Sequence, residues 1–243
     1  MQYALLTDKG KVRGKNEDNL FARLYTDTAG FFMVADGMGG HVYGDVASGI
    51  ASDIASLHSE ASILSIINGE DPEKVLFALV EEINNKIMEQ ALQNREMLGM
   101  GTTLVMAIVC NNKLHISNVG DSRLYLYRDK ELQLLTVDHS VVQEMYEQGI
   151  ISKEEAIGHP QKNILTRAVG CDKNVNPDYF EYDIYKEDIL LLCTDGLTNI
   201  VDDSVMAEII GKNNDLEALC NELVAIANQN GGLDNITCIA VKI

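Results

Sequence analysis

The chain has 243 residues, of which 46% are hydrophobic and 23% charged, and its formal net charge is −18. This is the composition of a folded globular protein with enough apolar material for a sizeable core. The acidic balance argues against a nucleic-acid partner and against anionic membrane surfaces, because both recruit clustered Lys and Arg.

Targeting and cysteine patterns point to an ordinary intracellular protein. The longest apolar runs have the length of a strand, far short of a membrane span, and the first residues do not resemble a secretory signal. The five cysteines are scattered without a CxxC pair, which favours reduced, buried thiols over a disulfide framework or a zinc site. We therefore expect a soluble cytoplasmic protein.

The first half of the chain predicts strands followed by two helices. The opening YALLTD alternates apolar and polar residues, 20–25 is a further strand candidate, and the continuous apolar run 31–35 is typical of a buried strand. Residues 45–57 carry Ala and Ile at helical spacing. A second helix is expected to start at Pro72, after which apolar residues recur at nearly helical spacing up to Leu92.

The second half predicts mainly strands, then helices and a last strand. Strands are expected at 102–110, 114–119, 124–127, 132–135, 179–185, 189–193 and 236–243, and helices at 141–148, 204–210 and 216–228. Asn111 and Asn112 lie between two strands, which indicates an antiparallel hairpin. Because the strands and helices come in blocks, the pattern favours an antiparallel α+β layer structure.

Four aspartates lie where predicted strands end or begin. Asp36, Asp121 and Asp195 follow apolar strands, and Asp234 directly precedes one. Each aspartate alone is a common turn residue. If these strands lie in sheets with their acidic ends at one edge, however, several carboxylates converge with no Lys or Arg beside them in sequence.

Such a cluster suits divalent cations. Neighbouring carboxylates raise one another's pKa, and a bound cation relieves this repulsion. Oxygen ligands favour Mg²⁺ or Mn²⁺ over zinc. Glu17 and Asp18 add two further carboxylates, and the nearby Arg13 is a candidate for holding a phosphate through a bidentate contact.

These residues fall in motifs that resemble the bacterial branch of the PPM (type 2C) protein serine/threonine phosphatases. The motifs are TDKGKVRGKNED at 7–18, VADGMGGH at 34–41, GDVAS at 44–48, GTTL at 101–104, VGDSRLY at 119–125, DHS at 138–140, LTRAVG at 165–170, TDGLTN at 194–199 and GGLDNIT at 231–237. They follow the family's order and span nearly the whole chain. The resemblance implies one catalytic domain over residues 1–243, built as an αββα sandwich of two packed antiparallel sheets flanked by helices.

The resemblance also implies roles for the residues of the first motifs. Asp36 would bridge two metal ions, and the backbone carbonyl of Gly37 would be a ligand of the second ion. Glu17 resembles the glutamate that coordinates the second ion, partly through water. Asp18 would position a metal-bound water. Gly39 and Gly40 give the backbone the freedom that close approach to an ion requires.

Further roles follow from the later motifs. Asp195 and Asp234 match the remaining ligands of the first ion. Asp121 resembles a ligand of a third, weaker ion shared with Asp195. Arg13 matches the arginine that grips the substrate phosphate. The expected cofactors are thus two core Mn²⁺ or Mg²⁺ ions and a weaker third one.

Two positions depart from the family pattern. Eukaryotic relatives have a histidine directly after the first Asp-Gly, often given the role of general acid, where this chain has Met38. His41 lies three residues further on and is the candidate acid, with a structural histidine and proton supply by water as the alternatives. Some relatives carry an aspartate where this chain has Asn199, so the third ion should bind more weakly or through waters.

The implied function is hydrolysis of phosphoserine and phosphothreonine in proteins by a metal-activated water, opposing a bacterial Ser/Thr kinase, by a monomer. The main alternative is a non-catalytic module on the same fold that only docks phosphoproteins, which is expected to lose carboxylate ligands. All six carboxylates of the motifs are present. A second alternative restricts the substrate to one regulator in a partner-switching pathway, but those relatives have altered glutamate and glycine motifs.

Overall fold

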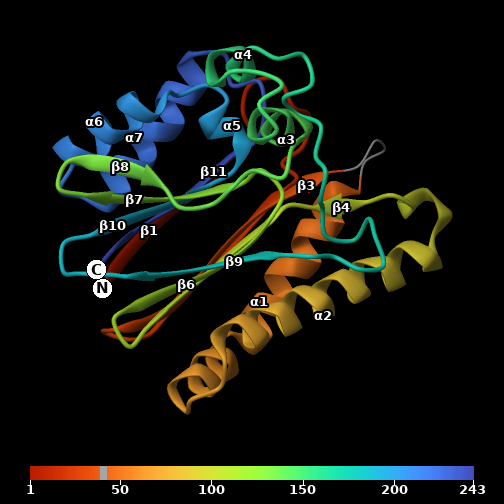
Figure 1. Ribbon diagram of the computed structural model, residues 1–243, viewed down its shortest axis with the longest axis horizontal. Helices are drawn as coiled ribbons and strands as arrows, with labels where there is room; N and C mark the ends of the chain where they lie inside the picture. The colour runs from red at the N-terminus through yellow and green to blue at the C-terminus, as the bar shows by residue number, and fades with distance from the viewer. Residues whose placement is uncertain (39–42) are drawn as a thin grey trace.

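The computed structural model describes residues 1–38 and 43–243. In these residues the strands form two antiparallel sheets that pack face to face, with helices on both outer sides (Figure 1). The first sheet has the order β1-β11-β10-β7-β8, and the second has the order β2-β3-β5-β6-β9 with the short β4 beside β3. The αββα sandwich expected from the sequence is confirmed.

The strands are β1 (Gln2–Asp8), β2 (Asp18–Thr26), β3 (Ala29–Met38), β4 (Gly101–Thr102), β5 (Leu104–Cys110), β6 (Lys113–Val119), β7 (Arg123–Arg128), β8 (Glu131–Leu134), β9 (Asp178–Asp183), β10 (Ile189–Cys193) and β11 (Ile236–Lys242). The helices are α1 (Gly44–Ile67), α2 (Pro72–Gln93), α3 (Val141–Glu147), α4 (Lys153–Ile157), α5 (Asp195–Thr198), α6 (Asp203–Lys212) and α7 (Leu216–Gln229), with a short 3₁₀ turn at Arg95–Met97.

Strand β5 is apolar throughout because both of its faces are covered. In β5, Leu104 and Met106 face the helices α1 and α2, whereas Val105 and Ala107 face the other sheet. Successive side chains of a strand point to opposite faces, so a strand covered on both sides favours apolar residues at every position. This explains the continuous apolar run in the sequence.

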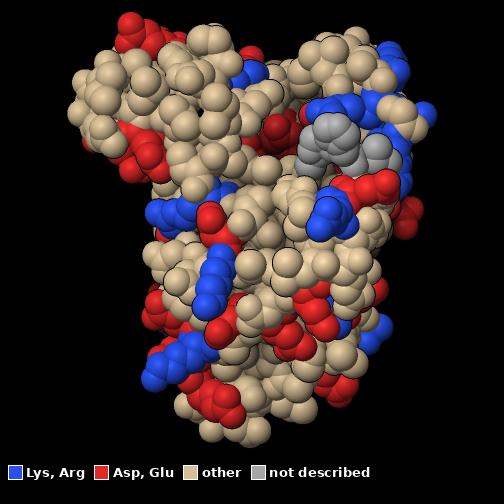
Figure 2. All heavy atoms as spheres, turned by 90° about the vertical axis from the view of Figure 1, so that its right-hand side faces the viewer, with Lys and Arg blue, Asp and Glu red and all other residues tan. Residues whose placement is uncertain are grey.

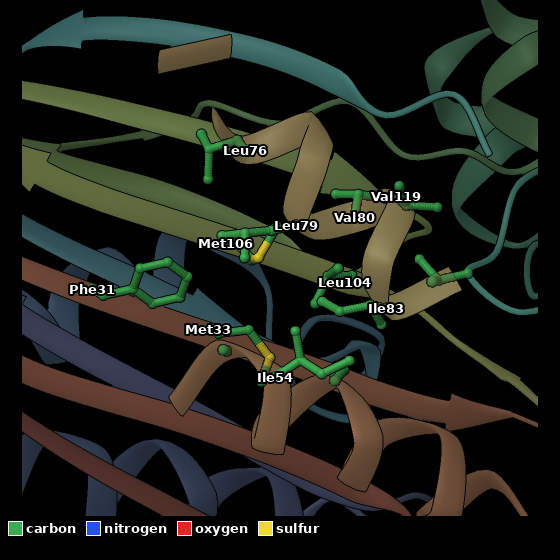
Figure 3. Close-up of a cluster of buried hydrophobic side chains, with 14 of the residues drawn as sticks. Phe31, Met33, Ile54, Leu76, Leu79, Val80, Ile83, Leu104, Met106 and Val119 are labelled. Carbon is green, nitrogen blue, oxygen red and sulfur yellow. The ribbon is translucent and has the colours of Figure 1, made fainter. Parts of the chain in front are cut away.

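Helices α1 and α2 cover the outer face of the second sheet. Phe31 and Met33 of β3 share one buried cluster with residues of both helices, in which Met33 lies beside Ile54 of α1 and Met106 of β5 lies beside Leu79 of α2 (Figure 3). Helix α2 starts as expected, with Pro72 in its first turn and the Asp71 side chain accepting a hydrogen bond from the Glu73 backbone N–H at 3.1 Å.

Helix α1 runs ten residues beyond the predicted end at Leu57. The apolar pattern fades there because two of its buried positions are Ser59 and Ser62. The Ser62 hydroxyl donates to the His58 carbonyl oxygen at 3.0 Å, which satisfies it inside the helix.

The other sheet is covered by α5, α6 and α7 (Figure 1). Met206 and Ile209 of α6 and Leu219 and Leu223 of α7 pack on Leu191 of β10. In the described part of the chain, no helix combines the length and apolar character that a bilayer span needs.

One end of the sandwich gathers the loops that carry the sequence motifs. Asp18 at the start of β2 lies opposite Asp36 near the end of β3. In the other sheet, Cys193 at the end of β10 pairs with Cys238 near the start of β11, so Asp195 and Asp234 lie at this same end. The Thr194 hydroxyl donates to Asp18 Oδ2 at 2.8 Å and thereby connects the two sheets.

Candidate metal centre at the end of the sandwich

Both sheets contribute carboxylates to this end of the sandwich. Asp18 and Asp36 come from β2 and β3, and Asp195 and Asp234 come from the ends of β10 and β11. Asp121 lies where the chain passes from β6 in one sheet to β7 in the other. The convergence predicted from strand ends is therefore present, and it depends on the way the two sheets are packed.

Burial and mutual repulsion raise the pKa of four of these carboxyls. Burial raises the pKa of Asp18 to about 7, with the charges of Asp195 and Asp234 adding to the effect. Burial, followed by the charge of Asp195, raises the pKa of Asp121 to about 8.

Asp36 and Asp195 show the same effect. Burial and the charges of Asp18, Asp195, Asp121 and Asp234 raise the pKa of Asp36 well above its ordinary value. The pKa of Asp195 is raised by burial and then by the charge of Asp234. Ionisable groups whose surroundings shift their pKa this strongly are typical of functional sites.

Two oxygen atoms of the cluster have no hydrogen-bond partner in the part of the chain that the structure describes. They are Asp18 Oδ1 and Asp195 Oδ1, and both are inaccessible to solvent. Buried polar atoms are nearly always paired, so orphaned carboxylate oxygens that face a cluster of like charge fit a hard cation. Among the described residues, however, no three Asp, Glu, His or Cys side chains already form a closed set of ligands. The carboxylates are close enough to repel one another but are not drawn together into a cage.

Asp234 forms an ion pair with Arg13 at the edge of the cluster. The Arg13 guanidinium donates to Asp234 Oδ2 at 2.6 Å, with about half of the arginine side chain exposed. The hydrogen bond with Asp234 raises the pKa of Arg13, and the charges of Asp36 and Asp195 add to this effect. The predicted phosphate-binding residue thus lies at the carboxylate cluster.

Glu17 and Gly37 are positioned through their backbones. The Gly37 N–H donates to the Glu17 carbonyl oxygen at 3.1 Å, and a Cβ atom on Gly37 would lie 2.2 Å from the Gly44 carbonyl oxygen. Only glycine fits this crossing of the chain, which explains the residue type after Asp36. The Glu17 side chain is half-buried beside it. His41, with Gly39 and Gly40, lies outside the described residues.

Asn199 contacts the cluster in place of the aspartate of some relatives. Its side-chain amide donates to Asp195 Oδ2 at 2.9 Å, and its Oδ1 accepts from Lys162 Nζ at 3.1 Å. Lys162 also has a small lowering effect on the pKa of Asp195.

Three polar residues that sequence analysis left without a role support the site. Asn235 Oδ1 accepts from the Glu17 backbone N–H at 2.8 Å. Thr103 accepts from the Asp36 N–H through its hydroxyl and donates its own N–H to the Asp36 carbonyl oxygen, both at 2.9 Å. Thr194 holds Asp18, as described above. Asn235, Thr103 and Thr194 all lie inside the family motifs, which was the only signal for them in the sequence.

The space-filling view shows a hollow at this end of the molecule. Acidic atoms line its floor, next to the residues that are not described, and Lys and Arg side chains gather along one side of it (Figure 2). An exposed cleft with an acidic floor and a basic rim suits a phosphate ester that is bound through cations below and guanidinium or ammonium groups above.

Comparisons with known proteins agree with this geometry. A family model described as Protein phosphatase 2C matches residues 7–236. The chain is 42% identical over 236 residues to the serine/threonine phosphatase stp of Listeria monocytogenes, covering 97% of this chain and 93% of that protein.

Solved structures match over the same length of the chain at lower sequence identity. The crystal structure of the Mycobacterium tuberculosis serine/threonine phosphatase PstP/Ppp is 33% identical with a TM-score of 0.91, covering 100% of this chain and 98% of that chain. The catalytic domain of serine threonine protein phosphatase PstP in complex with 2 manganese ions is 32% identical with a TM-score of 0.87, covering 99% and 97%.

These matches support the enzymatic interpretation over the non-catalytic module. They extend over nearly the full length of both chains, and the relatives are phosphatases by name. The chain therefore belongs to the protein phosphatase 2C family and is a metal-dependent protein phosphatase of the serine/threonine class.

Proposed function

We propose that this phosphatase hydrolyses phosphoserine and phosphothreonine in proteins with two Mn²⁺ or Mg²⁺ ions held by the carboxylate cluster, and that it opposes a Ser/Thr kinase in the cytoplasm. The observation that carries this is the set of four carboxyls with raised pKa, two of which have an orphaned oxygen. An all-oxygen donor set suits these ions. The manganese-bound PstP relative supports the same choice.

Asp36 would contribute to holding both ions, Glu17 and the Gly37 carbonyl oxygen would hold one, and Asp195 and Asp234 would hold the other. Asp121 would serve a third, weaker site, since Asn199 already donates to Asp195 there. Bound cations supply a nucleophilic water near neutral pH and screen the charge of the phosphate.

The residues of the chain perform the remaining steps. Asp18, held by the Thr194 hydroxyl, is buried beside the cluster and can accept a proton from the attacking water. Arg13 exchanges Asp234 for the substrate phosphate, whose oxygens offer it a second acceptor. Asp234 then becomes free to act as a ligand. His41 is proposed as the acid that protonates the leaving oxygen.

A direct test measures phosphate release from a phosphothreonine peptide. We expect turnover with Mn²⁺ or Mg²⁺, none in excess EDTA, and full recovery when the metal is restored. Thiol-alkylating inhibitors should have little effect, because four of the five cysteines are buried and none is part of the site. Undiminished turnover in EDTA would overturn the mechanism, and binding of the peptide without phosphate release would restore the docking-module alternative.

A further inference from the structure

A short segment near the start of this acidic chain concentrates positive charge. Residues 9–15, KGKVRGK, contain four of the 19 Lys and Arg residues and no acidic residue, in a chain whose net charge is −18. We call residues 9–15 the basic loop. It connects β1 to the segment that carries Glu17 and Asp18, so it borders the metal centre.

The basic loop is fixed in place by hydrogen bonds. The side-chain amide of Asn235 donates to the carbonyl oxygens of both Lys9 and Lys15, each at 2.9 Å, which ties the two ends of the loop together. The Lys11 N–H donates to the Gly232 carbonyl oxygen at 2.8 Å. A Cβ atom on Gly10 would lie 2.1 Å from the Asp234 carbonyl oxygen, so the loop packs directly on the chain beside the cluster. The backbone of the loop is therefore fixed beside Asp234 before any substrate arrives.

The four cations are not equivalent. Arg13 pairs with Asp234, and Lys15 Nζ lies 2.6 Å from Asp45 Oδ1. Lys9 and Lys11 are exposed, and neither forms an ion pair with any residue that the structure describes. The proposed mechanism uses Arg13 alone, which leaves these two ammonium groups of the same loop without an assigned role.

We propose that Lys9 and Lys11 form a subsite for a second anionic side chain of the substrate, either phosphorylated or acidic, next to the phosphoresidue that is hydrolysed. This rests on the proposed function. Lys11 is two residues from Arg13 in sequence, so their Cα atoms lie at most about 7 Å apart, the length of two fully extended residues. Lys9 is four residues from Arg13, so the same limit is about 14 Å. An extended substrate covers that distance in about four residues at roughly 3.3 Å each. The second anion therefore belongs within about four residues of the phosphoresidue.

The experiment compares three phosphothreonine peptides of equal length, assayed for phosphate release with Mn²⁺. One has neutral neighbours, one has two nearby glutamates, and one has a second phosphothreonine two residues away. We expect a higher kcat/KM for the anionic peptides. That advantage should fall about threefold to tenfold in Lys9→Gln/Lys11→Gln, as expected for two exposed charge contacts. Lys74→Gln/Lys86→Gln on α2 removes the same charge away from the site and should keep the advantage.

The outcomes separate the subsite from diffuse attraction and from the proposed function. An advantage confined to the doubly phosphorylated peptide and lost in Lys9→Gln/Lys11→Gln supports the subsite and identifies phosphate as its ligand. An advantage for both anionic peptides that is lost in Lys9→Gln/Lys11→Gln supports a subsite for any anion. Equal losses in the two double variants, or no advantage in the native protein, overturn the subsite. A native protein that releases phosphate from no peptide overturns the proposed function and this proposal together.

Discussion

The two ends of strand β10 bury carboxylates in opposite ways. Asp188, just before the strand, is 3% exposed and receives bonds from Arg128 at 2.8 and 2.6 Å and from the Tyr185 N–H at 2.7 Å. Asp195, just after the strand, faces other aspartates, and its Oδ1 has no hydrogen-bond partner among residues 1–38 and 43–243. One carboxylate is fully compensated and the other is not.

This difference separates structural from functional charge in a single molecule. A buried carboxylate with a guanidinium and a backbone N–H satisfies its own desolvation, and its removal weakens the fold. An uncompensated cluster weakens the metal-free fold and is useful only when a ligand neutralises it. The experiments below can break this distinction or make it sharper.

The largest effect is expected at Asp36. Asp36→Asn removes a ligand proposed to serve both ions, so turnover should fall at least about a thousandfold, or about 4 kcal/mol in transition-state stabilisation. Calorimetry should show the loss of more than one equivalent of bound Mn²⁺. In EDTA the variant should melt higher than the native protein, because the burial and the repulsion that raise the pKa of Asp36 no longer act on a neutral side chain. Normal turnover with two ions bound would remove Asp36 from the mechanism.

Asp188→Asn should show the reverse behaviour. Losing a charged partner of Arg128 should lower the free energy of unfolding by about 2–3 kcal/mol, measured by urea denaturation. The molecules that remain folded should retain turnover within about twofold. Asp183→Asn is a matched control, because Asp183 is an exposed partner of Lys113 and its loss should have an effect below about 1 kcal/mol. A turnover defect in Asp188→Asn would blur the distinction between the two ends.

Replacing Arg13 tests the proposal that its guanidinium exchanges Asp234 for the substrate phosphate. Arg13→Ala should raise KM for a phosphopeptide about tenfold, or about 1.4 kcal/mol, with a smaller fall in kcat, if the phosphate is held alike in ground and transition states. Without Arg13, Asp234 is also released from its 2.6 Å bond, so Mn²⁺ affinity should not fall. An unchanged KM with a large fall in kcat would instead mean that Arg13 binds the phosphate more strongly in the transition state than in the ground state.

A dependence of stability on pH is also expected. In the folded protein the pKa of Asp18 is about 7 and that of Asp121 about 8, against an ordinary value of 3.8. The folded state therefore holds more protons than the unfolded state between these values, and stability is lost as pH rises. In EDTA the melting temperature should fall from pH 5 to pH 8, and by less in Asp18→Asn.

Added Mn²⁺ should reverse this trend. Metal binding releases protons from the carboxyls, so stabilisation by Mn²⁺ should grow over the same pH range. A native protein that melts at a constant temperature in EDTA, with the same profile as Asp18→Asn, would contradict the repulsion at the site.

Much of the fold could be predicted because its strands are strongly patterned. The buried strand at Ile189–Cys193 was predicted with its observed bounds. The pairing of β1 with β11 could not be read from the sequence, because these strands lie at opposite ends of the chain and no local signal links them. The extension of α1 was missed because buried Ser59 and Ser62 interrupt its apolar stripe.

The candidate site shows the same division between local and distant information. Strand-end aspartates such as Asp36 and Asp195 are visible in the sequence, since each follows an apolar run. The bond from Arg13 to Asp234 and the contacts of Asn235 with the basic loop join residues more than 200 positions apart. A single sequence carries no record of such distances, and the role of an amide side chain depends on the partners that the fold supplies.

The register of β1 against β11 has a practical consequence for rearranging the chain. Gln2 lies opposite Lys242, so the two chain ends are neighbours, at the pole of the sandwich opposite the cleft (Figure 1). The Asn111–Asn112 turn, where both residues have positive φ, lies at that same pole, because β5 runs away from Asp36. A circular permutant that starts at Asn112, with the native ends joined by a short flexible linker, would leave every loop at the cleft uncut. Fluorescent or affinity fusions at either native end would likewise leave the cleft open to large phosphoproteins.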